Sequence, residues 1–131
     1  MDINSINIAN LAYIGDAVYE LEIRNFLIKK NKKVNELKEL STSYVSGNAQ
    51  SLILDYLIDN KYLSENEIDL VKRARNYKSK SKPKHTLIKD YKKATALECL
   101  FGYLYIYNDK DRIEKLIKII TELRWYYVSL W

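Results

Sequence analysis

Two carboxylates in an otherwise apolar stretch are the first residues of this chain whose types and spacing could do chemistry. The stretch from Leu11 to Leu21 reads LAYIGDAVYEL and carries Asp16 and Glu20, four residues apart. On a helix, side chains at this spacing project from the same side. Oxygen atoms from one or two carboxylates, completed by waters, are the ligands that magnesium prefers. Asp16 is therefore a candidate metal ligand.

The surroundings of Asp16 make its position unusual. On a helix turning by about 100° per residue, one side carries an expected core stripe of Leu11, Ile14, Val18 and Leu21. Asp16 faces the other way, among further apolar residues, which are Ala9, Ala12, Ile23 and Leu27. The pattern predicts a helix that is buried on more than one flank, and a buried carboxylate needs a partner. That partner could be a cation, Arg24 or the end of a neighbouring helix.

A second acid repeats the pattern. Glu98 lies in the apolar stretch ATALECLFGYL, with Ala94 four residues before it and Gly102 four residues after it. Gly15, beside Asp16, is also inside a helical pattern, where a glycine needs a packing reason. Two helices that cross closely at these small residues would bring Asp16 and Glu98 together.

The basic residues are concentrated in one part of the chain. Between Lys72 and Lys93 there are ten lysines and arginines and one acid, whereas the net charge of the whole chain is only +5. The segment KSKSKPKH, from Lys78 to His85, has no apolar residue and holds the only proline, which predicts an exposed basic loop. Such a patch indicates a polyanionic partner, although 17 of the 22 basic residues are lysine, so compositional bias is an alternative.

The elements that must position these residues are all helices. No segment alternates with period two, so we predict an all-α fold of five to seven helices in one domain, residues 1–131. The first helix follows Asn7 or Ser5 and ends near Lys30. A second begins at Asn35 and continues past Gly47 as one long or kinked helix. Others follow the Ser64–Glu67 capping box, span about 87–107 and begin at Asp109.

Several classes of protein are not expected. No apolar run approaches a membrane span and the N-terminus is polar, so we expect neither a membrane segment nor a signal peptide, and the cytoplasm is the default compartment. The single cysteine, Cys99, forms no internal disulfide and is expected to be a small core residue rather than a nucleophile.

Both acidic stretches resemble motifs of the ribonuclease III family. LAYIGDAVYEL resembles the signature L-x-[FY]-[LI]-G-D-[AS]-[VI], and ATALECLFGYL resembles the second acidic motif, acid-x-x-E-A-L-x-G. The basic stretch KRARNYKSKSKPKHT resembles that of the short bacterial subgroup, Mini-ribonuclease III, which lacks a double-stranded-RNA-binding domain. This resemblance implies a helical bundle like the ribonuclease III endonuclease domain, and a homodimer with two active sites across a cleft that holds an RNA duplex.

The resemblance also implies an activity and its residues. The chain would be a Mg²⁺-dependent endoribonuclease for double-stranded RNA, with Asp16 and Glu98 as catalytic residues and metal ligands, and with Mn²⁺ able to replace Mg²⁺. Its implied substrate is the base-paired stem of precursor 23S ribosomal RNA. Glu20 would either reach the metal through water or pair with Arg24. Larger family members carry further acids where this chain has Ala12 and Thr95, which implies fewer direct ligands.

The basic stretch supplies the expected RNA contacts. These are Arg73, Arg75, Asn76, Lys78, Lys80, Lys82, Lys84 and His85. Arg73 and Arg75 could equally be structural, because they fall in a helix. The aromatic tail, which includes Trp125 and Trp131, is better explained by packing than by base stacking, because a duplex offers no unstacked bases.

Two other functions stay open at this point. One is a non-catalytic, ribosome-associated RNA-binding module of the same fold, and the other is a helical protein-interaction domain. The sequence also leaves open whether a ribosomal protein presents the substrate.

Overall fold

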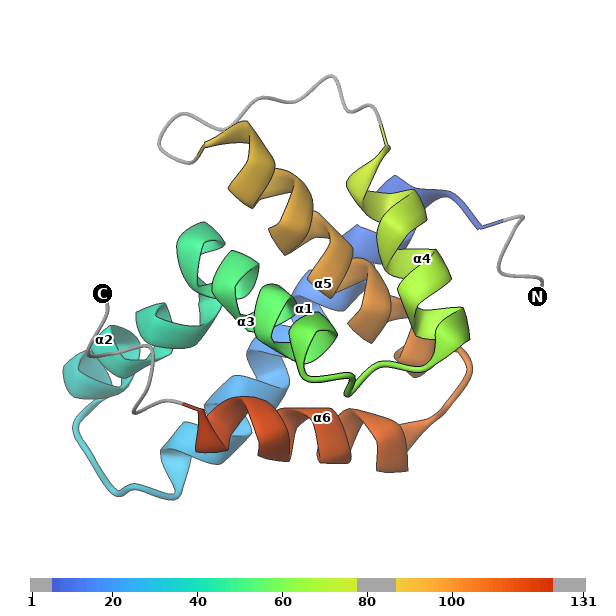
Figure 1. Cartoon of the computed structure of the whole chain (residues 1–131). Helices are drawn as coiled ribbons and strands as arrows, with labels where there is room; N and C mark the ends of the chain where they lie inside the picture. Colours follow the sequence, from blue (N-terminus) through green and yellow to red (C-terminus); the bar gives the residue numbers. More distant parts are fainter. Residues whose placement is uncertain (1–5, 78–86, 124–131) are drawn as a thin grey trace.

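The computed structural model of the chain describes residues 6–77 and 87–123. In these ranges it contains six helices and no strand (Figure 1), which confirms the all-α prediction. The helices are α1 (Ile8–Ile28), α2 (Val34–Val45), α3 (Gly47–Asp59), α4 (Glu65–Arg75), α5 (Ile88–Ile106) and α6 (Lys110–Glu122). None of the described helices combines the length and the apolar composition that crossing a membrane requires.

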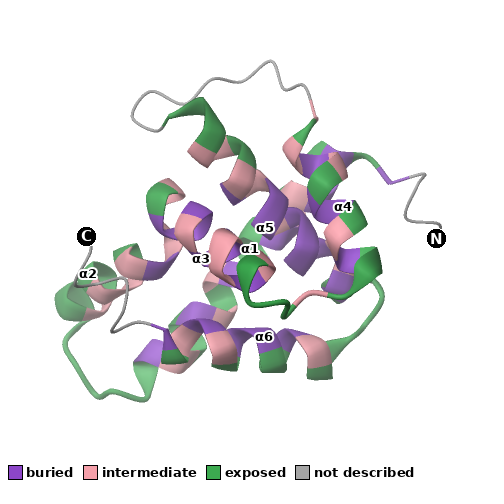
Figure 2. Ribbon diagram, in the orientation of Figure 1, coloured by how far each residue is buried: buried purple, intermediate pink, exposed green. Residues whose placement is uncertain are grey.

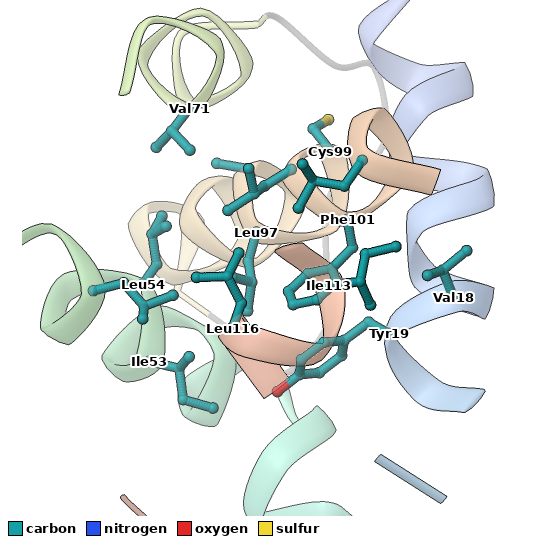
Figure 3. Close-up of a cluster of buried hydrophobic side chains, with 14 of the residues drawn as sticks. Val18, Tyr19, Ile53, Leu54, Val71, Leu97, Cys99, Phe101, Ile113 and Leu116 are labelled. Carbon is teal, nitrogen blue, oxygen red and sulfur yellow. The ribbon is translucent and has the colours of Figure 1, made fainter. Parts of the chain in front are cut away.

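Helix α5 is the centre of the molecule. It packs against α1, α3, α4 and α6, while α2 packs against α1 and α3. Its buried residues occupy most of its circumference (Figure 2), because neighbours cover it on several sides. The core that results includes Tyr19, Leu54, Leu97, Phe101 and Leu116, all fully buried (Figure 3).

Three helix starts agree with the sequence. The Asn7 side chain accepts a hydrogen bond from the Ala9 backbone N–H at 2.7 Å, and the Asp109 side chain caps α6 in the same way. Ser64 and Glu67 form the complete capping box at the start of α4. Each cap satisfies a backbone N–H that the first turn of a helix leaves without a partner.

The predicted long second helix is wrong in two respects. It begins at Val34 after Lys33, so Asn35 does not cap it. It also ends at Val45, because Ser46 has extended backbone angles and its side chain accepts a hydrogen bond from the Ala49 N–H at 3.1 Å. Ser46 thereby ends α2 and begins α3, so a capping serine separates two helices where the sequence pattern predicted one.

The predicted orientation of α1 also needs correction. Leu21 is 59% exposed, whereas Ile23 and Leu27, which were placed on the side of Asp16, are buried. Asp16 itself is exposed. The core row of this helix is Leu11, Gly15, Tyr19, Ile23 and Leu27. These residues face the core because α5 crosses α1 at Gly15, and the opposite side of α1 therefore faces outward.

Candidate active site

The site is built on a crossing of α1 and α5 at which the two backbones touch. A Cβ atom added to Gly15 would overlap the carbonyl oxygen of Glu98, and one added to Gly102 would overlap the carbonyl oxygen of Leu11. Any larger residue would therefore push the helices apart. This confirms the prediction of a close helix crossing, which explains both Gly15 and Gly102.

The crossing brings Asp16 and Glu98 together. Their carboxyl groups are within hydrogen-bonding contact, with Asp16 exposed and Glu98 half-buried. Burial, followed by the negative charge of Asp16, raises the pKa of Glu98 to about 8, and Glu20 adds a smaller repulsion. The chain thus holds two carboxylates so close that they favour sharing a proton or a cation.

Arg24 does not neutralise this pair. Its guanidinium lies 3.5 Å from the carboxylate of Glu20, one turn earlier on the exposed side of α1. This contact confirms one of the two roles considered for Glu20. Such an exposed pair contributes little to stability.

Gln50 is a residue of the site that the sequence did not reveal. Its side chain is buried, with 3% exposed, and its Nε2 donates to the Val45 carbonyl at 3.0 Å. The Gln50 amide also lies close enough to Glu98 to oppose the rise of the pKa of that carboxyl group. The Oε1 atom of Gln50 is buried without a hydrogen-bond partner in the described part of the chain. A lone glutamine in an amphipathic pattern gives no signal of such a contact.

Tyr19 and Cys99 support the crossing without taking part in the acidic pair. The buried Tyr19 hydroxyl donates to the Tyr44 carbonyl at 2.8 Å, and burial raises its pKa well above 10.0. The buried Cys99 thiol donates to the Ile8 carbonyl at 3.3 Å, and burial raises its pKa to about 12. A thiol so protonated is a core group, as predicted, and not a nucleophile.

Comparison with known proteins decides the family. Residues 9–109, which contain both acids and the helix crossing, match the family model described as the ribonuclease III domain. The chain belongs to the ribonuclease III family. It is therefore an endoribonuclease.

Similar proteins in this family align with this chain over most of both sequences. A Mini-ribonuclease 3 of Clostridium tetani is 43% identical over 93% of this chain and 81% of its own. One of Staphylococcus aureus is 40% identical over 91% of this chain and 90% of its own. A crystal structure of a Fusobacterium nucleatum protein superposes with a TM-score of 0.80 at 33% identity, over 92% of this chain and 96% of that one.

The residues at the crossing fit the divalent metal that the ribonuclease III family generally requires. Asp16, Glu98 and the unpartnered Oε1 of Gln50 offer oxygen atoms only, which suits Mg²⁺ or Mn²⁺. Within residues 6–77 and 87–123, no group of three or more His, Cys, Asp or Glu side chains is close enough to enclose a metal. An ion here would therefore keep several waters, as magnesium does.

The basic residues divide into two groups. Arg73 is half-buried and donates to the Ile6 carbonyl at 3.0 Å, which ties α4 to the start of α1. Arg75 is half-buried, and Asn76 is exposed at the C-terminal end of α4. The other predicted RNA contacts lie outside the described residues; these are Lys78, Lys80, Lys82, Lys84 and His85. Helix α4 ends and α5 begins on the same side of the molecule (Figure 1).

Proposed function

We propose that this chain is a Mg²⁺-dependent endonuclease for double-stranded RNA, with Asp16 and Glu98 as its catalytic carboxylates and metal ligands. One observation carries the proposal: the Gly15–Gly102 crossing places these two acids in direct contact although they are far apart in the sequence. Keeping two carboxylates this close is unfavourable without a proton or a cation between them. A catalytic metal site accounts for an arrangement that stability alone does not favour.

Each acid has a distinct part in the proposed site. Glu98 is half-buried and held by Gln50, so it fixes the inner side of the metal site once it has lost its proton. Asp16 is exposed, so it faces the side from which a phosphodiester can approach. When bound, magnesium or manganese activates water and stabilises the charge of a phosphoryl transition state. We assign to Glu20, which lies one turn from Asp16 and adds a repulsion to Glu98, the role of holding a water of the ion.

The basic stretch after α4 accounts for the choice of a duplex. Double-stranded RNA hides its base edges in a deep major groove, so proteins bind its phosphates and 2′-hydroxyls. We assign these contacts to Arg75, Asn76, the lysines at 78, 80, 82 and 84, and His85. For Arg73, the hydrogen bond to Ile6 favours a structural role.

A homodimer follows from the exposed side of α1. Tyr13 is 84% exposed, Ile28 is 68% exposed and Leu21 is 59% exposed. By helix geometry these apolar residues share an arc of about 140° with Asp16 and Glu20. Water is a poor solvent for such a surface. A second copy of the chain would cover it and bring two acidic sites near each other, one for each strand of a duplex.

The substrate we propose is the base-paired stem of precursor 23S ribosomal RNA in the cytoplasm, processed by a single catalytic domain that spans residues 1–131. Support for this choice comes from the relatives named Mini-ribonuclease 3, which are 43% and 40% identical to this chain. A stem of this kind is a continuous duplex, which a basic surface without base-reading residues can bind by shape.

The test is cleavage of a perfectly paired RNA duplex by the purified chain, with magnesium and with chelator. We expect magnesium-dependent cuts in both strands, and we expect Asp16→Asn and Glu98→Gln to abolish them while RNA binding stays nearly unchanged. Asp59→Asn, an exposed acid at the end of α3, is the matched control and should cleave normally. Salt-dependent RNA binding without cleavage under any divalent metal would instead indicate a non-catalytic RNA-binding module.

A further inference from the structure

Gln50 occupies a position that packing alone does not explain. It lies on α3 and is 97% buried, yet it is a polar residue with four hydrogen-bonding positions to satisfy. One amide N–H goes to the Val45 carbonyl at 3.0 Å, and the amide also lies beside the Glu98 side chain. Its Oε1 has no partner among the described residues. Burying an unsatisfied acceptor is unfavourable, so an apolar residue would serve the core better.

The break at Ser46 explains why the amide is fixed in this direction. In an uninterrupted helix, the Val45 carbonyl would accept a hydrogen bond from the Ala49 N–H. Here that N–H bonds to the Ser46 side chain at 3.1 Å, which leaves the Val45 carbonyl for Gln50. The Nε2 end of the amide is thus held by the backbone of the α2–α3 junction, while the amide lies beside Glu98.

The same junction is also bonded to the helix that carries Asp16. The carbonyl of Tyr44 accepts the buried hydroxyl of Tyr19, which lies on α1 three residues after Asp16. Residues 44–50 therefore contact both helices of the acidic pair, through the buried hydrogen bond with Tyr19 on α1 and through Gln50, which lies beside Glu98 on α5. Groups that hold a metal-ligating carboxylate by hydrogen bonds set its orientation.

We propose that Gln50 is a positioning residue, which orients the Glu98 carboxylate for metal binding and offers its Oε1 atom to a water of the bound ion. This inference rests on the proposed function of Asp16 and Glu98. Oε1 belongs to the same planar amide as the Nε2 group, so it lies within a few ångströms of the site. A water there would satisfy the buried Oε1 acceptor, which has no partner among the described residues.

A matched control lies one residue further along α3. Ser51 has the same exposure as Gln50, 3%, and its hydroxyl bonds to an acid of α5, Asp90, at 2.8 Å. Asp90 lies two turns before Glu98 and has no part in the proposed metal site. Ser51→Ala removes a buried hydrogen bond between the same two helices, so it reports the purely structural loss.

The experiment compares Gln50→Met, which keeps the length of the side chain and removes its amide, with Ser51→Ala and the unchanged protein. For Gln50→Met we expect kcat on duplex RNA to fall about 10- to 100-fold, the magnesium midpoint to rise, and KM for RNA to stay constant. The increase in Tm that magnesium produces without RNA should also become smaller. Ser51→Ala should lower Tm but leave the other three quantities unchanged. Gln50→Leu, also apolar and of similar size, serves if Gln50→Met unfolds.

Two results would overturn the inference in distinguishable ways. If the unchanged protein cleaves and Gln50→Met behaves as Ser51→Ala does, Gln50 is only a packing residue, while the proposed function stands. If the unchanged protein shows neither cleavage nor stabilisation by magnesium, the proposed function fails and the role of Gln50 fails with it.

Discussion

At the scale of single residues, the main feature is an acid kept in an unfavourable state. Glu98 has a pKa of about 8, raised by burial and by Asp16, against 4.5 for a free side chain. The folded chain therefore binds this proton more tightly than the unfolded chain. Glu98 favours folding fully only below about pH 4.5, and this contribution is lost as the pH rises through about 8.

This sign leads to a prediction for the metal-free protein. Glu98→Gln cannot ionise, so its Tm relative to the unchanged protein should increase as the pH is raised from about 5 to about 9. Thermal unfolding in chelator, followed by circular dichroism across this range, measures the difference. A Tm difference that is constant with pH would show that folding does not shift the pKa of Glu98. Stabilisation on loss of activity would be typical of a strained active site.

Metal binding should release the proton that Glu98 holds. Because Glu98 must be ionised to bind a cation, the affinity for magnesium should rise with pH until about 8 and then level off. Calorimetry in two buffers with different ionisation enthalpies should detect proton release below that pH. No release would mean that the cation binds elsewhere or leaves Glu98 protonated.

At the scale of elements, the contact between α1 and α5 is fixed by backbone and not by side chains. Gly15→Ala would place a methyl group on the carbonyl of Glu98, so we expect a loss of about 3 kcal/mol or more in the free energy of unfolding. Asn10→Ala, exposed on the same helix, should change stability by less than about 0.5 kcal/mol. Urea denaturation compares the two, and equal stability would mean that the helices separate without cost.

One ion pair joins α6 to the start of α4, in addition to the buried apolar residues of α6. Arg112 donates to both carboxylate oxygens of Glu67, at 2.9 and 2.7 Å, and to the Tyr62 carbonyl. Although burial raises it, hydrogen bonds from Arg112 and Ser64 hold the pKa of Glu67 below 4.5. A lowered folded pKa means that this stabilisation is complete above the unfolded value and is lost as the pH falls through the folded one.

Removing the charge tests this attachment. Glu67→Gln leaves Arg112 without its counter-ion, so we expect a loss of about 3 kcal/mol at neutral pH. The loss should shrink as the solution is acidified below about pH 4.5, because Glu67 of the unchanged protein then takes up a proton and no longer pairs with Arg112 as a charge. Glu65→Gln, exposed in the same turn, is the control. A loss that is independent of pH would mean that the shape of Glu67 matters and not its charge.

The elements also show how far sequence can lead. The pairing of Asp16 with Glu98 was predictable because glycine is costly inside a helix and only a close crossing explains Gly15 and Gly102. The break at Ser46 was not, because a serine before a glycine is tolerated inside many helices. Gln50 escaped because its partners, Val45 and Glu98, are set by that break and by tertiary packing. The assigned roles of the acids in catalysis stay predictions.

At the scale of the whole molecule, the prediction that the Asp16 side of α1 is buried was wrong for an instructive reason. The apolar residues predicted around it favoured burial within one chain, yet Asp16 is exposed and shares its side of α1 with the exposed Tyr13, Leu21 and Ile28. Hydrophobicity in a sequence indicates that a surface will be covered, but it does not say by which chain. This is the reason that we expect a second copy at α1.

The dimer can be tested at its most exposed aromatic residue. Tyr13→Arg would place a charge in an apolar interface, so we expect dimerisation to weaken by about 2 kcal/mol or more, as for an interface hot spot. Sedimentation velocity should show monomers where the unchanged protein forms dimers, with cleavage reduced in parallel. Asn66→Arg, on the exposed side of α4, should stay dimeric. A Tyr13→Arg protein that remains dimeric would place the interface elsewhere.

The buried thiol at the helix crossing offers a way to time the opening of the fold. Cys99 is the single cysteine of the chain, has no exposed surface, and bonds to the Ile8 carbonyl of α1. An alkylating reagent can reach it only after α1 and α5 separate, because the reactive thiolate does not form in the closed state. The rate of labelling therefore reports how often the two acids part. The natural chain carries this reporter without an added probe, so all of the variants above can be compared on one kinetic scale.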